Sequence, residues 1–481
     1  MRKMMSLEEV SNAVNGKIVN KSLNGYEPIC ISGVSKDTRT IEEGNIYVAI
    51  DGERFKGHVF TEQAIDSGAS CVLVNDPDKI PQGAVGVVVE DTVRALGDLA
   101  RAYRFKLGAK VICVTGSVGK TSTREMIACA LSSSFNVFST KRNENNEIGL
   151  PMTILSAPED TEVLVLELGM RLRGEISYLT NVACPDIAVI TNVGYSHIER
   201  LGSQQEILLA KSEITEGLTE GGILAVNADD KLLFDYSRNN IPIGNGLVGI
   251  RVITDPSKAS GEVMNCPLMV SAYDVDFEDG CKFRMDITGA DREEMDVSLS
   301  LNGIHNVRNA LFALLCAHLT GADMAKAAAS LSSYEQMNGR GKTTDANGMR
   351  IINDAYNASP ESMKAAFANL DILGKGRRKI AVLGGMLELG EYAPMLHEQV
   401  GRDCGAYAFD KIFVTGDNRD DFVRGLLAVR SDADLTLCED TADVREKISG
   451  YAREGDCILF KASNAFGFEK LASEMSREKD I

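Results

Sequence analysis

The chain has 481 residues, more than one hydrophobic core usually organises, and its length therefore predicts two to four domains of about 100 to 200 residues each. Its 51 Lys and Arg stand against 69 Asp and Glu, a formal net charge of -18, which argues against a protein that wraps a nucleic-acid backbone. A small anionic ligand would have to be bound by local groups such as helix N-termini, backbone amides and a few cationic side chains, rather than by the overall charge of the protein.

The eleven cysteines are scattered along the chain, without a Cys-x-x-Cys pair and without a cluster beside a histidine. This spacing argues against a zinc site and indicates reduced core cysteines. No apolar run reaches the roughly 18 residues of a membrane span, and no apolar stretch suited to a secretory signal follows residues 1–5. We therefore expect a cytoplasmic protein without membrane insertion.

The first region, residues 1–108, opens with a helical pattern at 6–14. Short β-branched runs follow at 44–50, 71–76 and 85–91, and Gly and Asp residues separate them. These features predict a small α/β domain. A helical pattern at 94–105 then leads into the continuous apolar strand 109–116, which is typical of a sheet buried on both faces.

The central region, residues 109–335, alternates strands with helices. Strand patterns end at 116, 169 and 193, each is followed by a helical pattern, and a further strand lies at 222–227. This order predicts a doubly wound parallel sheet. Between about 249 and 301 the apolar period changes to two, which predicts an antiparallel sheet added to the parallel one. Helical patterns at 304–319 and 322–331 complete the domain.

A glycine-bearing polar junction at 337–348 precedes the last region, residues 336–481, where a third series of strands and helices begins. This series predicts a Rossmann-like domain. The expected fold class is therefore α/β with three domains: a small N-terminal domain, a central phosphate-loop domain with an added antiparallel sheet, and a Rossmann-like C-terminal domain.

The sequence TGSVGKTST, at residues 115–123, lies between a predicted buried strand and an amphipathic helix. In such a loop the glycines let the backbone approach phosphates, Lys120 supplies a cation, and the Thr121 hydroxyl can bind Mg²⁺. Only Ser117 and Val118 stand between the first glycine, Gly116, and the Gly-Lys pair, whereas the common phosphate loop has four residues there. An ordinary glycine turn is the structural alternative, which the coincidence of strand, loop, Lys and Thr disfavours.

Three further side chains follow predicted strands toward the same sheet edge. Glu167 ends the strand VLVLELG, where a carboxylate suits Mg²⁺ or is a solvated strand-end charge. His197 follows the next strand, although a single histidine is as often structural. Lys211 lies on the helix after that strand, and the pattern alone favours an ordinary surface charge.

Further motifs follow the loop GSVGKTST in a fixed order, at 143–151, 167–170, 192–203, 210–214, 303–313, 339–342 and 353–362. Together with the loop they resemble the Mur ligase family, cytoplasmic enzymes that add amino acids to the peptidoglycan precursor. The resemblance covers essentially the whole chain. The motifs at 36–39, 52–58, 167–176, 353–362 and 384–391 are most similar to the members that add D-alanyl-D-alanine. Lys56 and Asn464 depart from the pattern, where relatives often carry Asp and Arg.

The resemblance implies ATP as cosubstrate and two Mg²⁺ ions, and it assigns roles to individual residues. Lys120 and the loop amides would bind the γ-phosphate, Thr121 and Glu167 one Mg²⁺, and His197 and a carbamylated Lys211 the second. Asn306 would contact adenine, Arg340 the phosphates and Asp354 the ribose. The residues that would bind ATP are Gly116, Ser117, Val118, Gly119, Lys120, Thr121, Ser122, Asn306, Arg340 and Asp354, and those that would contact the other substrates are Thr38, Arg39, Asn146 and Asn357.

The implied reaction is ATP-dependent ligation of D-alanyl-D-alanine to a UDP-N-acetylmuramoyl-tripeptide, through an acyl phosphate, by a monomer. The first domain would bind the UDP-sugar, the second ATP, and the third the dipeptide. Two alternatives stay open. A sister amide ligase would add a single amino acid or act on folate, and a nucleotide-gated binding protein without ligation would lack Glu167, His197 or Lys211.

Overall fold

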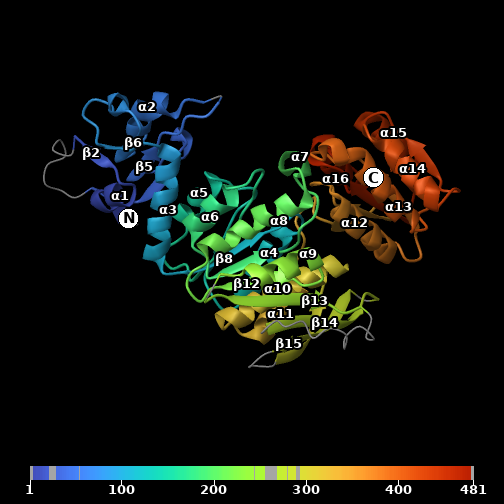
Figure 1. Ribbon diagram of the computed structural model, residues 1–481. Helices are drawn as coiled ribbons and strands as arrows, with labels where there is room; N and C mark the ends of the chain where they lie inside the picture. Colours follow the sequence, from blue (N-terminus) through green and yellow to red (C-terminus); the bar gives the residue numbers. More distant parts are fainter. Residues whose placement is uncertain are drawn as a thin grey trace.

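In the computed structural model, the structure describes residues 4–20, 29–53, 55–242, 244–254, 268–278, 280–288 and 293–477. The strands of these ranges form three large sheets and one two-stranded sheet. Figure 1 shows the large sheets in three successive bodies, with the first domain in blue, the central domain from cyan to yellow and the third domain in orange and red. The predicted three-domain α/β fold is thus confirmed.

The first domain is built on a five-stranded sheet in which β4 to β7 are parallel and β2 is antiparallel to β7. In spatial order the strands are β2 (Lys17–Val19), β7 (Gly86–Val88), β6 (Cys71–Val74), β5 (Asn45–Val48) and β4 (Gly33–Ser35). The short strands β1 (Met5–Ser6) and β3 (Cys30–Ile31) pair separately. The helices of this region are α1 (Leu7–Ala13), α2 (Thr61–Asp66), α3 (Thr92–Leu107) and the 3₁₀ turns η2 (Thr38–Thr40), η3 (Gly57–Phe60) and η4 (Pro77–Lys79).

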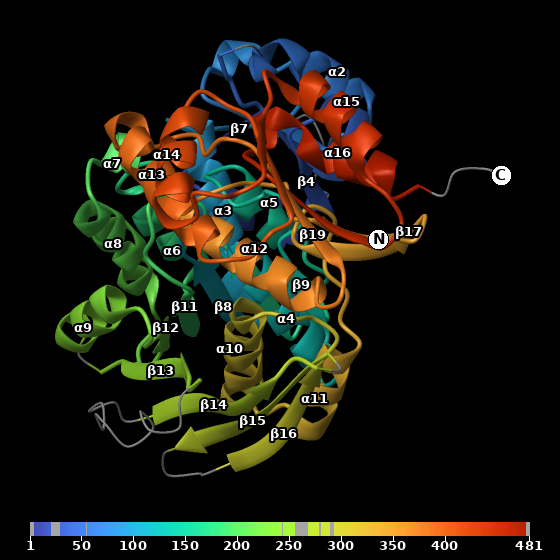
Figure 2. The ribbon, with the colours of Figure 1, turned by 90° about the vertical axis from the view of Figure 1, so that its right-hand side faces the viewer.

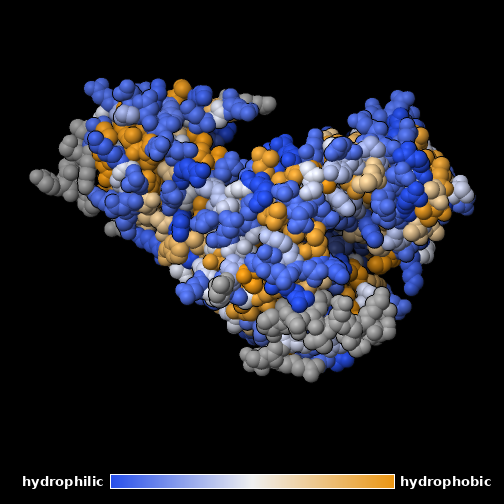
Figure 3. Space-filling model, in the orientation of Figure 1, coloured by the Kyte–Doolittle hydropathy of each residue, from blue (hydrophilic) through white to orange (hydrophobic). Residues whose placement is uncertain are grey.

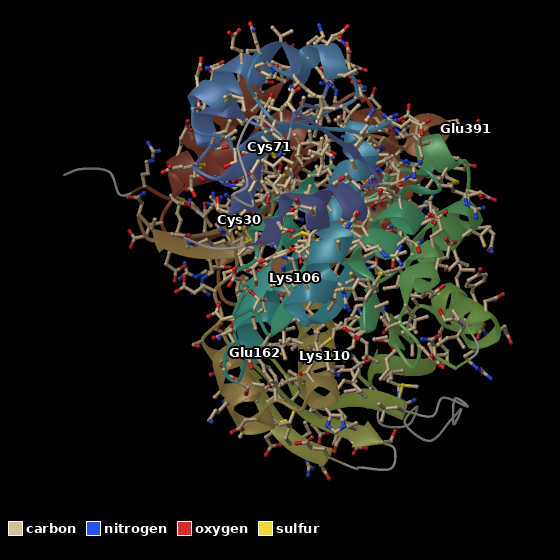
Figure 4. All side chains as sticks on the ribbon, turned by 90° about the vertical axis from the view of Figure 1, so that its left-hand side faces the viewer. Cys30, Cys71, Lys106, Lys110, Glu162 and Glu391 are labelled. Carbon is tan, nitrogen blue, oxygen red and sulfur yellow. The ribbon has the colours of Figure 1, made fainter. Side chains whose placement is uncertain are left out.

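Helix α3 joins the first domain to the central one. Lys106, labelled in Figure 4, forms an ion pair with Glu9 of the first domain at 3.0 Å. On the other side Arg104 is buried, donates to the carbonyl oxygens of Ala183 and Cys184, and pairs with Asp186 at 3.2 Å. One helix thus carries contacts to both domains.

We expect Arg104→Leu to lower the free energy of unfolding by about 3 kcal/mol, because it leaves two buried carbonyls without a donor and Asp186 without its cation. Urea titration followed by circular dichroism measures this loss. Arg101→Leu, an exposed position on the same helix, is the control and should change the midpoint little. Equal midpoints for the two variants would show that Arg104 does not stabilise this junction.

The central domain contains a nine-stranded sheet within the described ranges. Its spatial order is β16 (Glu293–Leu299), β15 (Cys281–Thr288), β14 (Leu268–Asp276), β13 (Gly246–Val252), β12 (Ile223–Asn227), β11 (Ile187–Ile190), β8 (Lys110–Thr115), β10 (Val163–Glu167) and β9 (Val137–Ser139). Strand β8 lies between β11 and β10, and its residues 111–114 are fully buried, as the apolar run predicts.

The antiparallel part of this domain is continuous with the parallel sheet rather than a separate layer. Strand β14 pairs in parallel with β13 on one side and antiparallel with β15 on the other. The change of apolar period thus marks a change of strand direction within one sheet. Of the predicted strand region at 249–301, residues 255–267, 279 and 289–292 lie outside the described residues.

Helices cover both faces of the central sheet. One face packs on α4 (Lys120–Leu131), α10 (Ile304–Thr320) and α11 (Met324–Ser332). The remaining helices are α5 (Gly149–Ser156), α6 (Glu175–Ala183), α7 (Ile198–Leu201), α8 (Gln204–Ser212), α9 (Lys231–Asn240) and the 3₁₀ turn η5 (Glu213–Gly217). Because β8 leads directly into α4 at the middle of the sheet, the phosphate loop lies at the carboxyl edge of the parallel strands.

The third domain has a six-stranded sheet that is parallel except for β17. Its order is β17 (Lys342–Ala346), β18 (Met349–Asn353), β22 (Asp456–Lys461), β19 (Arg378–Leu383), β20 (Lys411–Val414) and β21 (Leu435–Leu437). Its helices are α12 (Pro360–Leu373), α13 (Ala393–Gly405), α14 (Arg419–Val429), α15 (Thr441–Tyr451), α16 (Phe468–Met475), η7 (Gly390–Tyr392) and η8 (Asn464–Phe466). Figures 1 and 2 both place α7 of the central domain against this third domain.

None of the helices in the described ranges combines the length and apolar character needed to cross a lipid bilayer.

Candidate active site

A cavity of about 1450 Å³ lies at the carboxyl edge of the central sheet, and the third domain forms its opposite wall. The phosphate loop and Glu167 line one side, and Arg340, Asp354 and Glu361 the other. Figure 3 shows a broad notch in the molecular surface between the first and third domains, above the central one. The cavity is therefore a space between domains, suited to bringing more than one substrate together.

The phosphate loop turns sharply at Gly116, whose φ is 150°. A Cβ atom at this position would lie 1.9 Å from Oγ1 of Thr191, which belongs to the neighbouring segment after β11. Only glycine leaves room for the Thr191 side chain here and adopts this φ without strain. The first glycine of the motif is thus required by the fold of the loop itself.

The segment 191–196 holds the loop through several hydrogen bonds. Asn192 accepts from the amides of Ser117 and Val118, through its carbonyl oxygen and its side-chain oxygen respectively. The amide of Gly194 donates to Ser117 Oγ at 2.8 Å. These bonds already satisfy two of the loop amides, so a bound phosphate would rely chiefly on the amides of the first turn of α4 and on Lys120.

Lys120 begins α4, and its Nζ donates to the carbonyl oxygen of Gly116 at 2.7 Å. Burial at the base of the cavity lowers the pKa of Lys120, and the nearby carboxylate of Glu167 opposes this shift. The Lys120 side chain therefore bends back over the phosphate loop, and its ammonium group lies in the cavity wall. From there it can turn toward a bound anion.

Glu167 ends β10 beside the loop and is 2% exposed. Its carboxylate accepts from Thr121 Oγ1 and from Asn145 Nδ2, each at 2.9 Å. Arg124 Nη1 lies 3.7 Å from Oε2 of the same carboxylate. Sequence reasoning singled out neither Asn145 nor Arg124, although Asn145 lies inside the quoted motif at 143–151.

Mg²⁺ prefers hard oxygen ligands. The Thr121 hydroxyl and the Glu167 carboxylate supply two such oxygens side by side at the end of the phosphate loop, so these residues fit a magnesium ion. Within the described part of the chain, no group of three or more His, Cys, Asp and Glu side chains could hold a metal on its own. Further ligands would have to come from other groups.

Among the expected site residues Lys211 is a buried lysine, only 1% exposed. It lies near the C-terminal end of α8 and does not belong to the residues that line the cavity. Burial and the nearby positive charge of Lys120 lower the pKa of Lys211 well below its usual value, although Glu361 acts in the opposite direction. A buried lysine of this kind tends to be an uncharged amine.

His197 caps the short helix α7 and faces the third domain. Its Nδ1 lies 2.8 Å from Oε2 of Glu388, in the loop after β19. Burial and then the positive charge of Lys120 lower the pKa of His197, and the Glu388 carboxylate acts in the opposite direction. The imidazole is therefore neutral at pH 7.

A second contact between the domains involves Glu361 at the start of α12. Its Oε1 accepts from the amide of Tyr195 at 3.0 Å, while its Oε2 is buried without a hydrogen-bond partner. A Cβ on Gly194 would lie 2.3 Å from Cδ of Glu361, so the carboxylate rests directly on the glycine backbone. Burial raises the pKa of Glu361.

Arg340 reaches from the start of the third domain to the phosphate loop. Its guanidinium lies 3.6 Å above the ring of Tyr356, and Nη2 donates to Thr121 Oγ1 at 3.3 Å. Deeper in the same wall, Asp354 pairs at 2.9 Å with Lys461, a buried lysine that sequence reasoning missed. The structure thus brings Arg340 to Lys120, Thr121 and Glu167, as the resemblance implies.

The other expected site residues fall into three groups. Asn146 and Asn357 line the cavity, although the side-chain oxygen of Asn146 accepts from the amides of Ile148 and Gly149. Asn306 is buried, and its Nδ2 donates to the carbonyl of Asn302 rather than facing the cavity. The remaining two, Thr38 and Arg39, lie in the first domain away from the cavity wall, with Arg39 paired to Asp37.

Comparisons with known proteins agree with this architecture. The Mur ligase family catalytic domain matches residues 30–104, the Mur ligase middle domain matches 114–317, and the glutamate ligase domain of Mur ligases matches 339–464. The Bacillus subtilis protein UDP-N-acetylmuramoyl-tripeptide--D-alanyl-D-alanine ligase is 36% identical to this chain over 98% of both. The Escherichia coli protein of the same name is 34% identical over 83% of this chain and 84% of its own.

Solved structures give the same result. A crystal structure of MurF from Acinetobacter baumannii superposes with a TM-score of 0.83 at 27% identity and covers 98% of this chain and 99% of its own. MurF ligase from Thermotoga maritima in complex with ADP has a TM-score of 0.76 at 28% identity, and covers 92% of this chain and 96% of its own. With matching domains along its length and relatives of this identity over nearly all its residues, the chain belongs to the Mur ligase family.

Proposed function

We propose that this chain ligates D-alanyl-D-alanine to a UDP-N-acetylmuramoyl-tripeptide at the expense of ATP. The products are the UDP-muramoyl-pentapeptide of peptidoglycan synthesis, ADP and phosphate. The observation that carries the proposal is the meeting of Lys120, Glu167 and Arg340 in one cavity between two domains. The full-length relatives with this activity support it.

The first chemical step is activation of the tripeptide carboxylate. A carboxylate is a poor acyl donor, since its leaving group would be oxide. Its oxygen therefore attacks the γ-phosphorus of ATP, the bond to ADP breaks, and an acyl phosphate results. Lys120 and Arg340 stabilise the charge on the transferred oxygens, one from the loop and one from the third domain.

The magnesium ions would shield phosphate charge during this step. Thr121 and Glu167 would hold one ion, and His197 and Lys211 the other. A neutral, buried Lys211 can add CO₂ to its amine and release a proton, and the carbamate formed is a hard, negatively charged oxygen ligand. This modification accounts for a buried lysine where a metal site needs negative charge.

The second step is attack of the dipeptide amine on the acyl phosphate. The amine adds to the carbonyl carbon, the tetrahedral intermediate loses the amine proton and expels phosphate, which can carry that proton away, and an amide bond remains. Water would destroy the acyl phosphate, so the site must be closed while it exists. The contacts of Glu361 and Glu388 with the segment 194–202 give the third domain a means of closing over the phosphate loop.

The remaining expectations extend the proposal. The three domain ranges 1–108, 109–335 and 336–481 would bind the UDP-sugar, ATP and the dipeptide respectively, with Asn306 at the adenine and Asp354 at the ribose. Thr38, Arg39, Asn146 and Asn357 would contact the other substrates. The enzyme would act as a monomer in the cytoplasm, where ATP and the UDP-linked precursor are made.

The test is to incubate the purified protein with ATP, Mg²⁺, UDP-muramoyl-tripeptide and D-alanyl-D-alanine. We expect the pentapeptide, by mass spectrometry, and one phosphate released for each one formed. Single amino acids offered in place of the dipeptide should release little phosphate, whereas a sister ligase would prefer one of them. If no amine yields product or phosphate, the chain is not a ligase of this kind.

A further inference from the structure

The loop after β19, residues 384–391, contains a carboxylate to which the phosphate chemistry gives no role. Glu388 Oε2 of the third domain lies 2.8 Å from Nδ1 of His197 in the central domain, an ion-pair distance at which the ring N–H is not directed straight at the carboxylate oxygen. The Glu388 side chain is 48% exposed, so the fold does not force it into this contact by burial. Its contact with His197 therefore needs a separate explanation.

The backbones at both ends of this contact are unusual. His197 has a φ of 67° and Glu388 a φ of 61°, in the left-handed region that residues other than glycine rarely adopt. Such conformations persist where the surrounding structure holds them, and they are concentrated at functional sites. Two strained residues that face each other across a domain boundary indicate a contact maintained for function.

The two nitrogens of the imidazole ring indicate how Glu388 acts on His197. A neutral ring carries one N–H, and its other nitrogen has a free lone pair. A carboxylate oxygen 2.8 Å from Nδ1 favours the proton on that nitrogen by electrostatic attraction, and the free lone pair is then on Nε2, which would be available to a metal ion. Histidines that bind metals commonly donate their second ring N–H to a carboxylate, which fixes both the tautomer and the ring orientation.

We propose that Glu388 is a positioning residue that orients His197 for the metal ion. Because Glu388 belongs to the third domain and His197 to the central one, the metal site is complete only when the two domains are docked. The inference rests on the proposed function, in which His197 is a metal ligand. It adds that this ligand is oriented across the domain boundary.

Two other residues near Glu388 serve as controls, because they separate the orientation of the His197 ring from the docking of the third domain on the central domain. Tyr392 of η7 donates its hydroxyl proton to the carbonyl oxygen of Gly202 at 2.7 Å, and thus joins the same two segments without contacting His197. The exposed Glu391, labelled in Figure 4, lies three residues beyond Glu388 and outside the cavity wall. Tyr392→Phe tests docking alone, and Glu391→Gln tests the loss of a carboxylate in the same loop.

The experiment measures Mn²⁺ binding to the full chain in the presence of ADP by electron paramagnetic resonance. We expect Glu388→Ala to weaken Mn²⁺ binding by about 10- to 100-fold, the range found for partners of metal-bound histidines. Glu391→Gln and Tyr392→Phe should bind Mn²⁺ nearly as the natural sequence does. The double variant His197→Ala, Glu388→Ala should bind no more weakly than His197→Ala alone, since the two residues act as a unit.

Two results would overturn the proposal: unchanged Mn²⁺ affinity in Glu388→Ala, or an equal loss in Tyr392→Phe, which would assign the effect to docking. Glu388→Gln, which keeps the shape of the side chain, and a melting curve for each variant guard against a folding defect. The ligation assay on the unaltered chain is scored separately. Failure of that assay with the expected Mn²⁺ pattern would refute the proposed function while leaving the role of Glu388 intact.

Discussion

Lys120→Met is expected to lower the ligation rate on the order of 10³-fold, the largest effect of any single change in the phosphate loop. The ammonium group already lies within the loop, where it donates to the carbonyl of Gly116. In the transition state it would turn to the γ-phosphate oxygens, whose charge a methionine of similar length cannot stabilise. Since α4 and its first-turn amides remain, ADP should bind to the variant with only modestly reduced affinity.

The measurement is the single-turnover rate of phosphate release with saturating substrates, together with ADP binding by calorimetry. Lys110→Met is the matched control: Lys110 is an exposed lysine at the opposite end of β8, labelled in Figure 4. It should keep the natural rate. Loss of ADP binding in parallel with the rate would instead make Lys120 a ground-state binding residue rather than one that acts in the transition state.

Lys211→Ala should reduce activity on the order of 10³-fold, because it removes the carbamate and with it several kcal/mol of metal-assisted charge stabilisation. Short carboxylic acids such as formate or acetate should restore part of this activity, since a free carboxylate can occupy the space left by the truncated side chain. The restored rate should rise with acid concentration and saturate. Formate should have no such effect on the unaltered chain.

The carbamate can also be observed directly. Incubation with ¹³C-labelled CO₂ should give one carbamate carbon signal in the NMR spectrum of the natural sequence and none in Lys211→Ala. Lys231→Ala, at the first residue of α9, should retain both the signal and the activity. An unrescued Lys211→Ala variant together with a missing carbamate signal would reduce Lys211 to a buried packing residue.

The parts of the fold that could be predicted from the sequence are those with strong local patterns. Strand β8 and helix α4 combine a continuous apolar run, a glycine turn and an amphipathic helix, and α4 follows the strand directly, as predicted. The pairing of β14 with strands of opposite direction on its two sides could not be predicted, since strand partners are set by tertiary packing. The period-two pattern predicts an antiparallel extension of the parallel sheet, as the structure has it, but does not show which strand forms the joint.

The candidate site shows the same difference between residues that a local sequence pattern identifies and contacts that only tertiary packing creates. Glu167 could be singled out because it ends a buried strand at the sheet edge where parallel sheets bind ligands. The hydrogen bond from Asn145 and the approach of Arg124 to this carboxylate depend on how separate segments fold back onto it. The contact between His197 and Glu388 spans nearly 200 positions, and no local pattern encodes such a pair.

The role that a family motif assigns to a residue does not show where the side chain of that residue lies in the folded chain. Asn306 shows the difference, since it does not line the cavity: its Nδ2 donates to the carbonyl of Asn302, and its Oδ1 accepts from Gln336 of the cavity wall. A family motif thus indicates which residues have the same role in related proteins, whereas the distances between these residues are known only from the folded structure. The role of Asn306 at the adenine stays a prediction.

Gly194 rests against the carboxylate of Glu361 with no space for even one added carbon. Alanine there would require either that Glu361 swing away from the amide of Tyr195 or that the two domains move apart. A glycine backbone therefore sets how closely helix α12 of the third domain can approach the segment after β11 of the central domain, and one methyl group at this position would widen that spacing.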